Sequence, residues 1–408
     1  MGAIGSATMV VTLSGVDRPG VTRDLFTTCS RFNVVVRDID QIVMRDRLIL
    51  ACSVEGAPTD IDALRPAIGQ LADRLDMDAA IDLQAESVRQ ETPVAPSGFR
   101  ITVMASDLDP SAVADIAAHI AAGGGNIDRI RRIAHYPITA IGFEGHGVDP
   151  DELRRPLAEI SSERNVDVAI QETGLHSRGQ YLVVMDVDST VIQDEVIDLL
   201  AAEAGQERAV AEVTASAMAG EIDFSESLHR RVALLAGLPD TVLATVRERI
   251  KLTPGARTLC RTLNRLGYRI ALVSGGFTQV VAPIAQQLGV AELRANTLEI
   301  ENGVLTGRVV GEIVDRPGKR KALEDLSVRF GIPRERTIAI GDGANDIDML
   351  EAAGMGIAFN AKPIARAAAD ASVSVPYLDS VLYLMGITRD EVEVADARDG
   401  IPTRPERG

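Results

Sequence analysis

The sequence is poor in the residues that build thiolate metal sites, disulfide frameworks and histidine-ligated metal centres. Among its 408 residues there are three cysteines, Cys29, Cys52 and Cys260, which lie far apart and show no metal-ligand spacing. We therefore expect reduced, buried thiols in a cytoplasmic protein. The five histidines form no ligand pair at helical spacing, so they are expected at the surface or in packing roles.

Long apolar runs and an excess of basic charge are also missing. No apolar stretch approaches the roughly 18 residues that predict a transmembrane helix, so we expect no membrane association. The chain carries 59 acidic against 42 basic residues, and its net charge of −17 disfavours nucleic acid as a partner. A composition of 46% hydrophobic and 25% charged residues is typical of a globular protein, and the length suits two to four domains.

What the sequence does contain is three short apolar runs, 181–185, 269–272 and 337–340, each followed by a polar loop. The loops carry carboxylates, a hydroxyl and glycines: Asp186 and Asp188 after the first run, Ser274, Gly275 and Gly276 after the second, and Asp342, Asn345 and Asp346 after the third. Such loops at the carboxyl ends of parallel strands open into the crevice where doubly wound sheets bind ligands.

The residue types in these loops suit phosphate and a divalent cation. Two carboxylates two residues apart lie on one side of an extended chain, where they can hold a cation and still offer a nucleophilic oxygen. Ser274 and exposed N–H groups can bind phosphate oxygens, and Lys319, between the second and third runs, can neutralise phosphate charge. Each motif alone has a plain structural alternative, such as a capping acidic pair, a turn or a surface lysine. Their combined order favours a site.

Together these motifs resemble the haloacid dehalogenase-like phosphohydrolase superfamily, and within it the phosphoserine phosphatase family, over residues 178–386. Glu195, nine residues after Asp186, and the segment 218–232 strengthen the resemblance. It implies a doubly wound, Rossmann-like α/β core with a helical cap at about residues 195–250. The remaining residues, 387–408, form a charged, proline-containing tail to which we assign no function.

The resemblance implies a role for each residue of the site. Asp186 would be the nucleophile and Asp188 the general acid and base, with Ser274, Gly275, Gly276 and Lys319 on the phosphoryl oxygens. Mg²⁺ would be bound by Asp186, the backbone carbonyl of Asp188 and Asp342, with Asn345 and Asp346 around that set. The amino acid part of the substrate would meet Glu195, Met218, Phe224 and Arg231, with Arg230 as the alternative to Arg231.

The implied activity is magnesium-dependent hydrolysis of O-phospho-L-serine through an aspartyl-phosphate intermediate. Two alternatives stay open from the sequence: a related small-molecule phosphatase or a phosphotransferase acting on homoserine, and an amino-acid sensor with an inert phosphatase domain. The intact set of acidic, hydroxyl and lysine residues disfavours the sensor.

The first half of the chain reads as two copies of one small domain, at residues 8–90 and 98–174. Each shows the order βαββαβ, which predicts an α+β, ferredoxin-like fold. Pro19 matches Pro110, and Asn33 matches Asn126, at nearly equal offsets along the chain. Residues 92–98 are a linker by composition.

The first copy resembles an ACT domain, an amino-acid-sensing module, through the loop from Asp17 to Gly20. The second copy departs from that pattern because Ser111 follows Pro110, although Gly125 and Asn126 keep the turn after its first helix. The resemblance implies an effector, L-serine or another amino acid, near Asp17, Gly20, Gly125 and Asn126. We also expect a homodimer formed through residues 8–174, and dimerisation alone is the other role that these copies could have.

Overall fold

The computed structural model describes residues 6–84, 98–174, 179–219 and 221–402. The chain divides into two compact units, residues 1–94 and 95–408. None of the helices within the described ranges combines the length and the apolar character that crossing a membrane requires.

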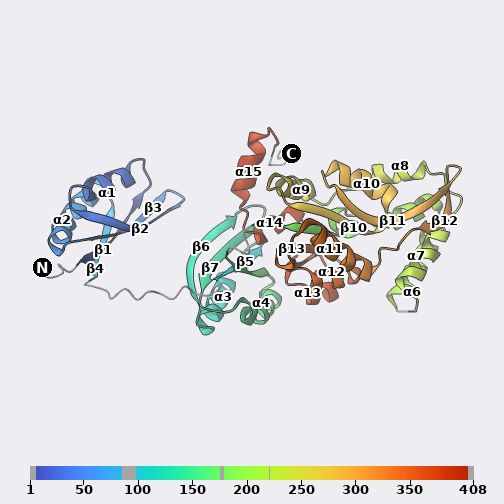
Figure 1. Cartoon of the computed structure of the whole chain (residues 1–408), viewed down its shortest axis with the longest axis horizontal. Helices are drawn as coiled ribbons and strands as arrows, with labels where there is room; N and C mark the ends of the chain where they lie inside the picture. Colours follow the sequence, from blue (N-terminus) through green and yellow to red (C-terminus); the bar gives the residue numbers. More distant parts are fainter. Residues whose placement is uncertain (1–5, 85–97, 175–178, 220, 403–408) are drawn as a thin grey trace. The chain divides into compact units, whose positions relative to one another are not determined.

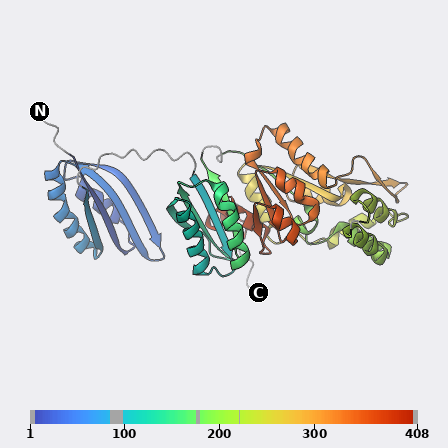
Figure 2. The same cartoon turned by 90° about the horizontal axis from the view of Figure 1, so that it is seen from below.

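The first unit is a βαββαβ domain. Its elements are β1 (Ala7–Val16), α1 (Val21–Cys29), β2 (Val34–Met44), β3 (Arg47–Gly56), α2 (Pro58–Leu75) and β4 (Asp78–Gln84). The antiparallel sheet has the order β2-β3-β1-β4. Both helices pack on one face of it (Figure 2), where Met9, Val11 and Leu13 alternate inward along β1 and are fully buried. The opposite face carries no helix.

The second unit begins with a second βαββαβ domain. Its elements are β5 (Gly98–Ala105), α3 (Pro110–Ala122), β6 (Asn126–Ala134), β7 (Thr139–His146), α4 (Pro150–Arg164) and β8 (Asp167–Thr173). The sheet order β6-β7-β5-β8 repeats that of the first domain. Phe99, Ile101 and Val103 face the two helices. Met104 and Ala140, on the other face, belong to the hydrophobic core of the α/β domain that follows.

That α/β domain is built on a seven-stranded sheet of order β12-β11-β10-β9-β13-β14-β15. Its strands are β9 (Leu182–Met185), β10 (Arg269–Phe277), β11 (Glu292–Glu301), β12 (Val304–Val310), β13 (Thr337–Gly341), β14 (Met355–Phe359) and β15 (Ala371–Val373). The neighbours from β11 to β15 are parallel, and β11–β12 is an antiparallel hairpin. Its turn residues Asn302 and Gly303 both have positive φ, as the Asn-Gly pair predicts.

Helices cover both faces of this sheet. They are α9 (Ala256–Arg265), α10 (Thr278–Gln287), α11 (Arg316–Phe330), α12 (Ile347–Ala352), α13 (Pro363–Ala368) and α14 (Val381–Leu384). The four residues of β9 are all buried and alternate between two separate cores, with Val183 and Met185 in one and Leu182 and Val184 in the other. A central strand buried on both faces is characteristic of a doubly wound fold. The fold class expected from the sequence is confirmed.

A helical insertion follows β9. It contains α5 (Val196–Ala204), α6 (Glu207–Met218), α7 (Phe224–Ala233) and α8 (Val242–Arg249). A bridge between Ile192 and Leu252 closes its base. The β11–β12 hairpin lies beside α7 (Figure 1), and the N–H of Gly237 donates to the carbonyl of Leu305 at 2.9 Å. The insertion is therefore held at its base and along the hairpin, as a cap over one end of the sheet.

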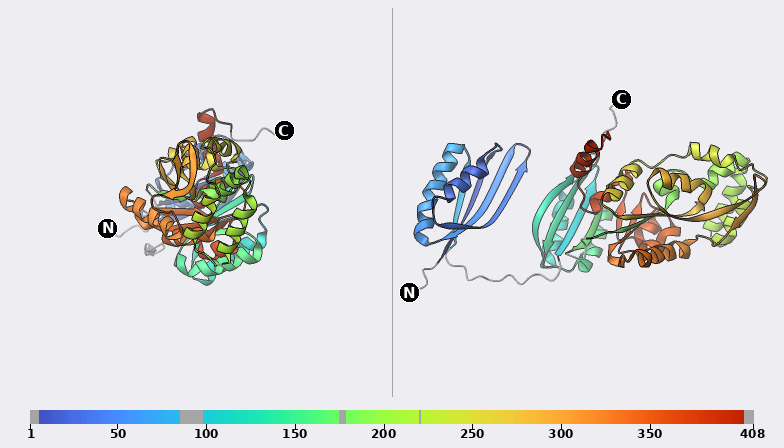
Figure 3. Two further views of the ribbon diagram at one scale, coloured as in Figure 1. Left: turned by 90° about the vertical axis from the view of Figure 1, so that its right-hand side faces the viewer. Right: turned by 45° about the horizontal axis from the view of Figure 1, so that its top comes forward.

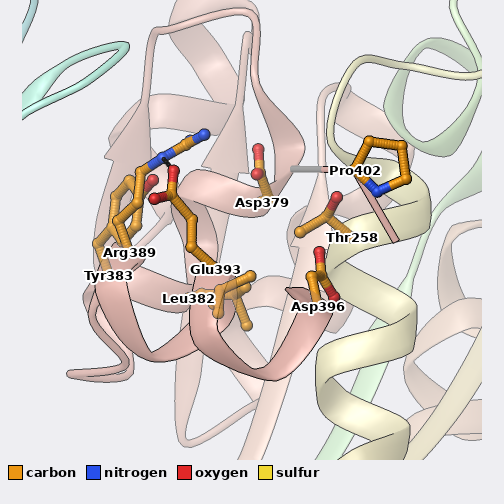
Figure 4. A pocket seen from close by; sticks show the side chains of 9 residues that line it. Thr258, Asp379, Leu382, Tyr383, Arg389, Glu393, Asp396 and Pro402 are labelled. Atoms are coloured by element: carbon orange, nitrogen blue, oxygen red, sulfur yellow. Dashed lines mark hydrogen bonds and ion pairs between the residues drawn. The ribbon is translucent and has the colours of Figure 1, made fainter. Parts of the chain in front are cut away.

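The segment left as a tail by the sequence analysis contains a helix, α15 (Arg389–Arg398), beside β6 (Figure 3). Thr388 and Glu391 form a capping box at its start, a Thr-x-x-Glu signal that is visible in the sequence. Asp396 pairs with Arg261 and Arg265 of α9, each at 2.5 Å. A cavity of about 50 Å³ is lined in part by residues of this helix. Figure 4 shows its lining side chains, which include the Arg389–Glu393 ion pair. Residues 387–402 are therefore part of the folded domain.

Candidate active site

Three loops meet at the carboxyl edge of the α/β sheet because the strands before them are neighbours. Strand β9 lies between β10 and β13, and all three run parallel. Asp186 follows β9, Ser274 lies in the last part of β10, and Asp342 follows β13. The strand order alone therefore brings together side chains that are up to 156 positions apart in the sequence, counted from 186 to 342.

A buried lysine joins two carboxylates at this edge. Lys319 Nζ lies 2.6 Å from Asp186 Oδ1 and 2.7 Å from Asp346 Oδ1, and all three side chains are almost fully buried. The other oxygen of Asp346 accepts the N–H groups of Asp342 at 3.1 Å and Gly343 at 3.0 Å. Burial by itself would lower the pKa of Lys319, but the charges of Asp186 and Asp346 outweigh it and raise that pKa, so the lysine is a fixed cation.

Asp188 is held by different partners from those of Asp186. Its Oδ1 accepts the N–H of Val196 at 2.9 Å, and its Oδ2 accepts the hydroxyl of Ser274 at 3.0 Å. The N–H of Gly276 donates to Ser274 Oγ at 2.8 Å. Any Cβ at Gly276 would lie 2.9 Å from Asp188 Oδ2, so this position has no room for a side chain. Burial raises the pKa of Asp188, which favours a carboxyl that can carry a proton.

The turn after Asp188 connects the sheet edge to the cap. Ser189 has a positive φ of 58°, and its hydroxyl donates to Glu195 Oε1 at 2.8 Å. Burial, followed by the negative charge of Asp188, raises the pKa of Glu195 to about 7. Glu195 is therefore an acid whose side chain still reaches solvent and whose charge depends on pH near neutrality.

The two adjacent arginines of α7 lie in different surroundings. Arg230 forms an ion pair with Glu226 on the exposed side of the helix. Arg231 is half-buried, and its burial lowers its pKa, while the charges of Asp198, Glu195 and Asp188 oppose that decrease. Arg231 is thus the arginine that faces the acidic side of the site.

The remaining cap residues expected from the sequence are only partly described. Phe224 approaches the glycine loop, because a Cβ on Gly275 would lie 3.3 Å from its ring. Met218 ends α6, but its side chain lies outside the described part of the chain.

Within the described part of the chain, Asp186, Asp342 and Asp346 form a group that could hold a metal ion, because one carboxylate oxygen from each lies within 4.8 Å of the others. The sequence analysis placed Asp346 farther from the metal and used the carbonyl of Asp188. The side chain of Asn345 lies against Gly343 rather than in this triad. Burial, and then the charge of Asp346, raises the pKa of Asp342 to about 6, and the charge of Lys319 opposes that increase.

One supporting residue had no motif in the sequence to identify it. Asn296, at the end of the parallel part of β11, is 1% exposed. Its amide donates to the carbonyl of Gly275 at 2.8 Å and accepts the N–H of Val314 at 2.9 Å. Asn296 therefore holds the loop at Gly275 in place. Its position beside this loop follows from the strand order, which the sequence does not show directly.

The expected effector residues belong to the two βαββαβ domains. In the first domain Gly20 has a φ of 99° just before α1, and the N–H of Asp17 bonds to the carbonyl of Asp46 at 2.8 Å. In the second domain a Cβ on Gly125 would collide with Val148, and Asn126 donates to Asp128. The two loops belong to separate units of the chain.

Comparisons with known proteins agree with this architecture. The family model of haloacid dehalogenase-like hydrolases matches residues 183–351, and two ACT domain models match residues 7–82 and 97–171. A phosphoserine phosphatase of Streptomyces coelicolor is 53% identical over 393 residues, which cover 95% of this chain and 94% of the relative. A phosphoserine phosphatase of Mycobacterium tuberculosis is 48% identical over 399 residues, 96% of each chain.

Among solved structures, a probable phosphoserine phosphatase from Vibrio cholerae has a TM-score of 0.56 at 32% identity, over 73% of this chain and 88% of that one. The chain belongs to the haloacid dehalogenase-like hydrolases, in their phosphoserine phosphatase family with two ACT domains, and it is a phosphatase. The family expected from the sequence is confirmed, and an inert sensor is excluded.

Proposed function

We propose that this phosphatase hydrolyses O-phospho-L-serine to L-serine and phosphate, the last step of serine biosynthesis, with Mg²⁺ as its cofactor. The observation that carries this proposal is the contact of Lys319 with Asp186 and Asp346. Asp188, two residues after Asp186, forms a separate pair with Ser274. One carboxylate is held next to a fixed cation, and the other is held by a hydroxyl and an N–H. Two acids in different surroundings suit two different chemical roles.

The acidic triad fits Mg²⁺, which prefers carboxylate oxygens and keeps several waters. Asp186 and Asp342 would bind the ion together with the backbone carbonyl of Asp188. Asp346 already accepts Lys319 and two N–H groups, so it would support the site from behind. The bound ion would supply positive charge that offsets the charge of the phosphate and of Asp186.

In the first step, an oxygen of Asp186 attacks phosphorus, and the bond from phosphorus to the serine oxygen breaks. Asp188 gives its proton to that oxygen, so serine leaves as the neutral alcohol. Lys319, Ser274 and the N–H groups of the glycine loop bind the phosphoryl oxygens. In the second step Asp188 takes a proton from a water molecule, and the water oxygen attacks phosphorus. The bond from phosphorus to the Asp186 oxygen breaks, so phosphate leaves and the free carboxylate of Asp186 is restored.

Substrate choice would depend on the cap. Glu195 would bind the ammonium group of phosphoserine, and Arg231 would grip the carboxylate with two parallel hydrogen bonds. The charge of Arg231 is close enough to be felt by Glu195, so one α-amino acid could meet both. Phe224 over Gly275 and Met218 would close the apolar side.

The test is phosphate release from phosphoserine and from a phosphate ester without a carboxylate, with and without added homoserine. Asp186→Asn should abolish turnover and the trapped phosphoenzyme, because an amide is no nucleophile. Asp188→Asn should lower kcat far more than it raises KM. Arg231→Ala should raise KM for phosphoserine only, and Arg230→Ala is its matched control. Substantial turnover by Asp186→Asn, or transfer of the phosphoryl group to homoserine, would contradict the proposal.

The ACT domains support regulation by an amino acid, and L-serine, the product, is the natural effector for feedback inhibition. Asp17 and Gly20 in the first domain, and Gly125 and Asn126 in the second, are the residues proposed near such a ligand. The test is inhibition by L-serine in the intact chain and in Gly20→Ala, which should weaken it.

We also propose a homodimer formed through the ACT domains. Strand β2 is an edge strand, and it exposes large apolar side chains on both of its faces: Val35, Val36, Ile39, Ile42, Val43 and Met44. An edge strand with unpaired backbone groups and an apolar surface favours pairing with another chain.

A further inference from the structure

The β11–β12 hairpin is attached to the cap through backbone hydrogen bonds (Figure 1). The N–H of Gly237 donates to the carbonyl of Leu305, and the N–H of Leu305 donates to the carbonyl of Leu238, each at 2.9 Å. The N–H of Asp240 donates to the carbonyl of Gly303 at 2.9 Å, and an antiparallel bridge joins the same two segments. The segment after α7 is therefore bound to the hairpin in the manner of an added strand.

The hairpin itself is braced where it leaves the sheet. The side-chain amide of Gln279, on α10, accepts the N–H of Leu298 at 3.2 Å and donates to its carbonyl at 2.7 Å. Glu299 accepts the hydroxyl of Thr306 and the guanidinium of Arg308, each at 2.6 Å, so side chains also join the two strands. The cap is thus held by an element that is itself fixed to the sheet.

Gly307, on β12, lies against the end of α7 with no room for a side chain. A Cβ there would lie 2.9 Å from the Cβ of Ala236 and 3.3 Å from both the Cα and the carbonyl oxygen of Ala233. Its φ of 82° also favours glycine. Two residues earlier, Leu305 is buried in the same hydrophobic core as Val232 of α7. A side chain at position 307 would therefore push the hairpin and the end of α7 apart.

The end of α7 that meets Gly307 is also the end that carries Arg231. Arg231 is two residues before Ala233, the last residue of the helix. Phe224, at the other end, is nine residues from Ala233, counted from 224 to 233, which is about 13 Å along a helix axis. A displacement at Gly307 would therefore move Arg231 more than Phe224.

Strand β11 fixes both sides of the substrate site. Asn296 of this strand donates to the carbonyl of Gly275 at 2.8 Å, and the hairpin at its far end holds the cap. We propose that Gly307 is a positioning residue for substrate recognition, because its close contact with the cap sets the distance of Arg231 from the phosphate-binding loop. This inference rests on the proposed function, in which Arg231 binds the carboxylate of phosphoserine.

The test compares hydrolysis of phosphoserine with that of phosphoethanolamine, which keeps the phosphate and the ammonium group but lacks the carboxylate. In Gly307→Ala, kcat/KM for phosphoserine should fall about tenfold, mainly through KM, because a small displacement of a substrate-positioning group is enough for such a loss. The value for phosphoethanolamine should change by less than about twofold. Gly311→Ala is the matched control, because Gly311 has a φ of 86° and a Cβ there would meet nothing within 4 Å. It reproduces the backbone strain without the collision.

A double variant, Gly307→Ala with Ala236→Gly, covers the case in which the single variant does not fold. It removes the tightest of the three contacts and leaves the two with the backbone of Ala233. Its KM for phosphoserine should therefore lie between those of Gly307→Ala and Gly311→Ala. A double variant no better than the single variant would overturn the proposal, as would one no worse than the control where only the double variant folds.

Arg231→Ala, measured in parallel, separates this inference from the proposed function. Equal losses of Gly307→Ala on both esters, or a KM for phosphoserine equal to that of Gly311→Ala, would overturn the positioning role. If Arg231→Ala loses the preference for phosphoserine while Gly307→Ala keeps it, the positioning role is wrong and the proposed function stands. If Arg231→Ala keeps that preference, the proposed function fails, and the positioning role fails with it.

Discussion

The two ACT domains have the same strand order but differ in what covers the open face of the sheet. In the first domain, the register pairs Ser14 with Ile49 on that face, and Ile49 is 44% exposed. In the second domain the corresponding pair is Met104 and Ala140, and both are fully buried in the core of the phosphatase domain. One fold therefore serves once as an integral part of the phosphatase and once as a separate unit.

The difference lies in the side chains of the open face rather than in the topology. Ala140 and Gly142 are small, so another domain can approach that sheet closely, and Thr102, which pairs with Gly142, is also buried. In the first domain, large apolar residues are instead concentrated on the edge strand β2, where an additional strand can pair. The open face of the second domain therefore resembles the interior of a protein, whereas strand β2 of the first domain resembles a surface that associates with another chain.

The largest expected effect comes from placing a charge on each open face. Met104→Glu buries an unpaired carboxylate and should lower the free energy of unfolding by about 3 kcal/mol or more. Ile49→Glu, the matched change in the first domain, should cost less than about 1 kcal/mol, because the side chain reaches water. Chemical denaturation at low protein concentration measures both. Equal losses would mean that the open face of the first domain is buried as well.

The next effect concerns self-association through β2. Ile42→Lys should weaken the proposed homodimer about 100-fold, because each interface would contain the lysine twice. Ile130→Lys, on the equivalent strand β6 of the second domain, is the control, since that isoleucine is also exposed and its domain is already docked. Sedimentation velocity over a concentration series gives both constants. A dimer lost only in the β6 variant would move the interface to the second domain.

The sequence predicted the elements of both ACT domains and a common location for the proposed catalytic residues, because alternation and strand-end motifs are local signals. Asp186, Ser274 and Asp342 were assigned to one site since parallel strands end at one edge. Asn296 and the position of Asp346 in the acidic triad depend on strand order and side-chain direction, which no local pattern encodes. The sequence also did not predict that Met104 packs into the core of the phosphatase domain. Alternation shows which residues share a face of a sheet, but not what covers that face.

The pH dependence of substrate binding extends the comparison of the two domains, because the proposed catalytic and substrate-binding residues all belong to the second unit. Burial raises the pKa of Glu195 to about 7, so this acid becomes neutral as the pH falls below that value. A neutral Glu195 loses its attraction for the ammonium group, and kcat/KM for phosphoserine should fall by up to about tenfold per pH unit below 7.

Glu195→Gln should remove this acidic limb, whereas Ile49→Glu in the first ACT domain should leave it in place. A phosphate ester without an amine corrects for titration of the phosphate itself. If the limb is the same for that ester and for phosphoserine, it belongs to the phosphate or to Asp188 and not to Glu195.

The smallest expected effect is a difference in stability between substitutions at the start of the first helix in each ACT domain. Gly20 has a φ of 99°, and an alanine there should cost about 1 kcal/mol of stability, because L-residues are strained in that region. A Cβ at Gly20 would meet only the flexible end of Arg23, so backbone strain rather than collision sets the cost. In the second domain α3 starts at Pro110, and Ser111 uses only its backbone N–H, which donates to Asp109 at 2.7 Å. Ser111→Ala should therefore be nearly neutral, and thermal unfolding of both variants measures the contrast. A Gly20→Ala protein as stable as the parent would show that the loop relaxes out of the left-handed region, and its use as a close-approach site for an effector would lose its basis.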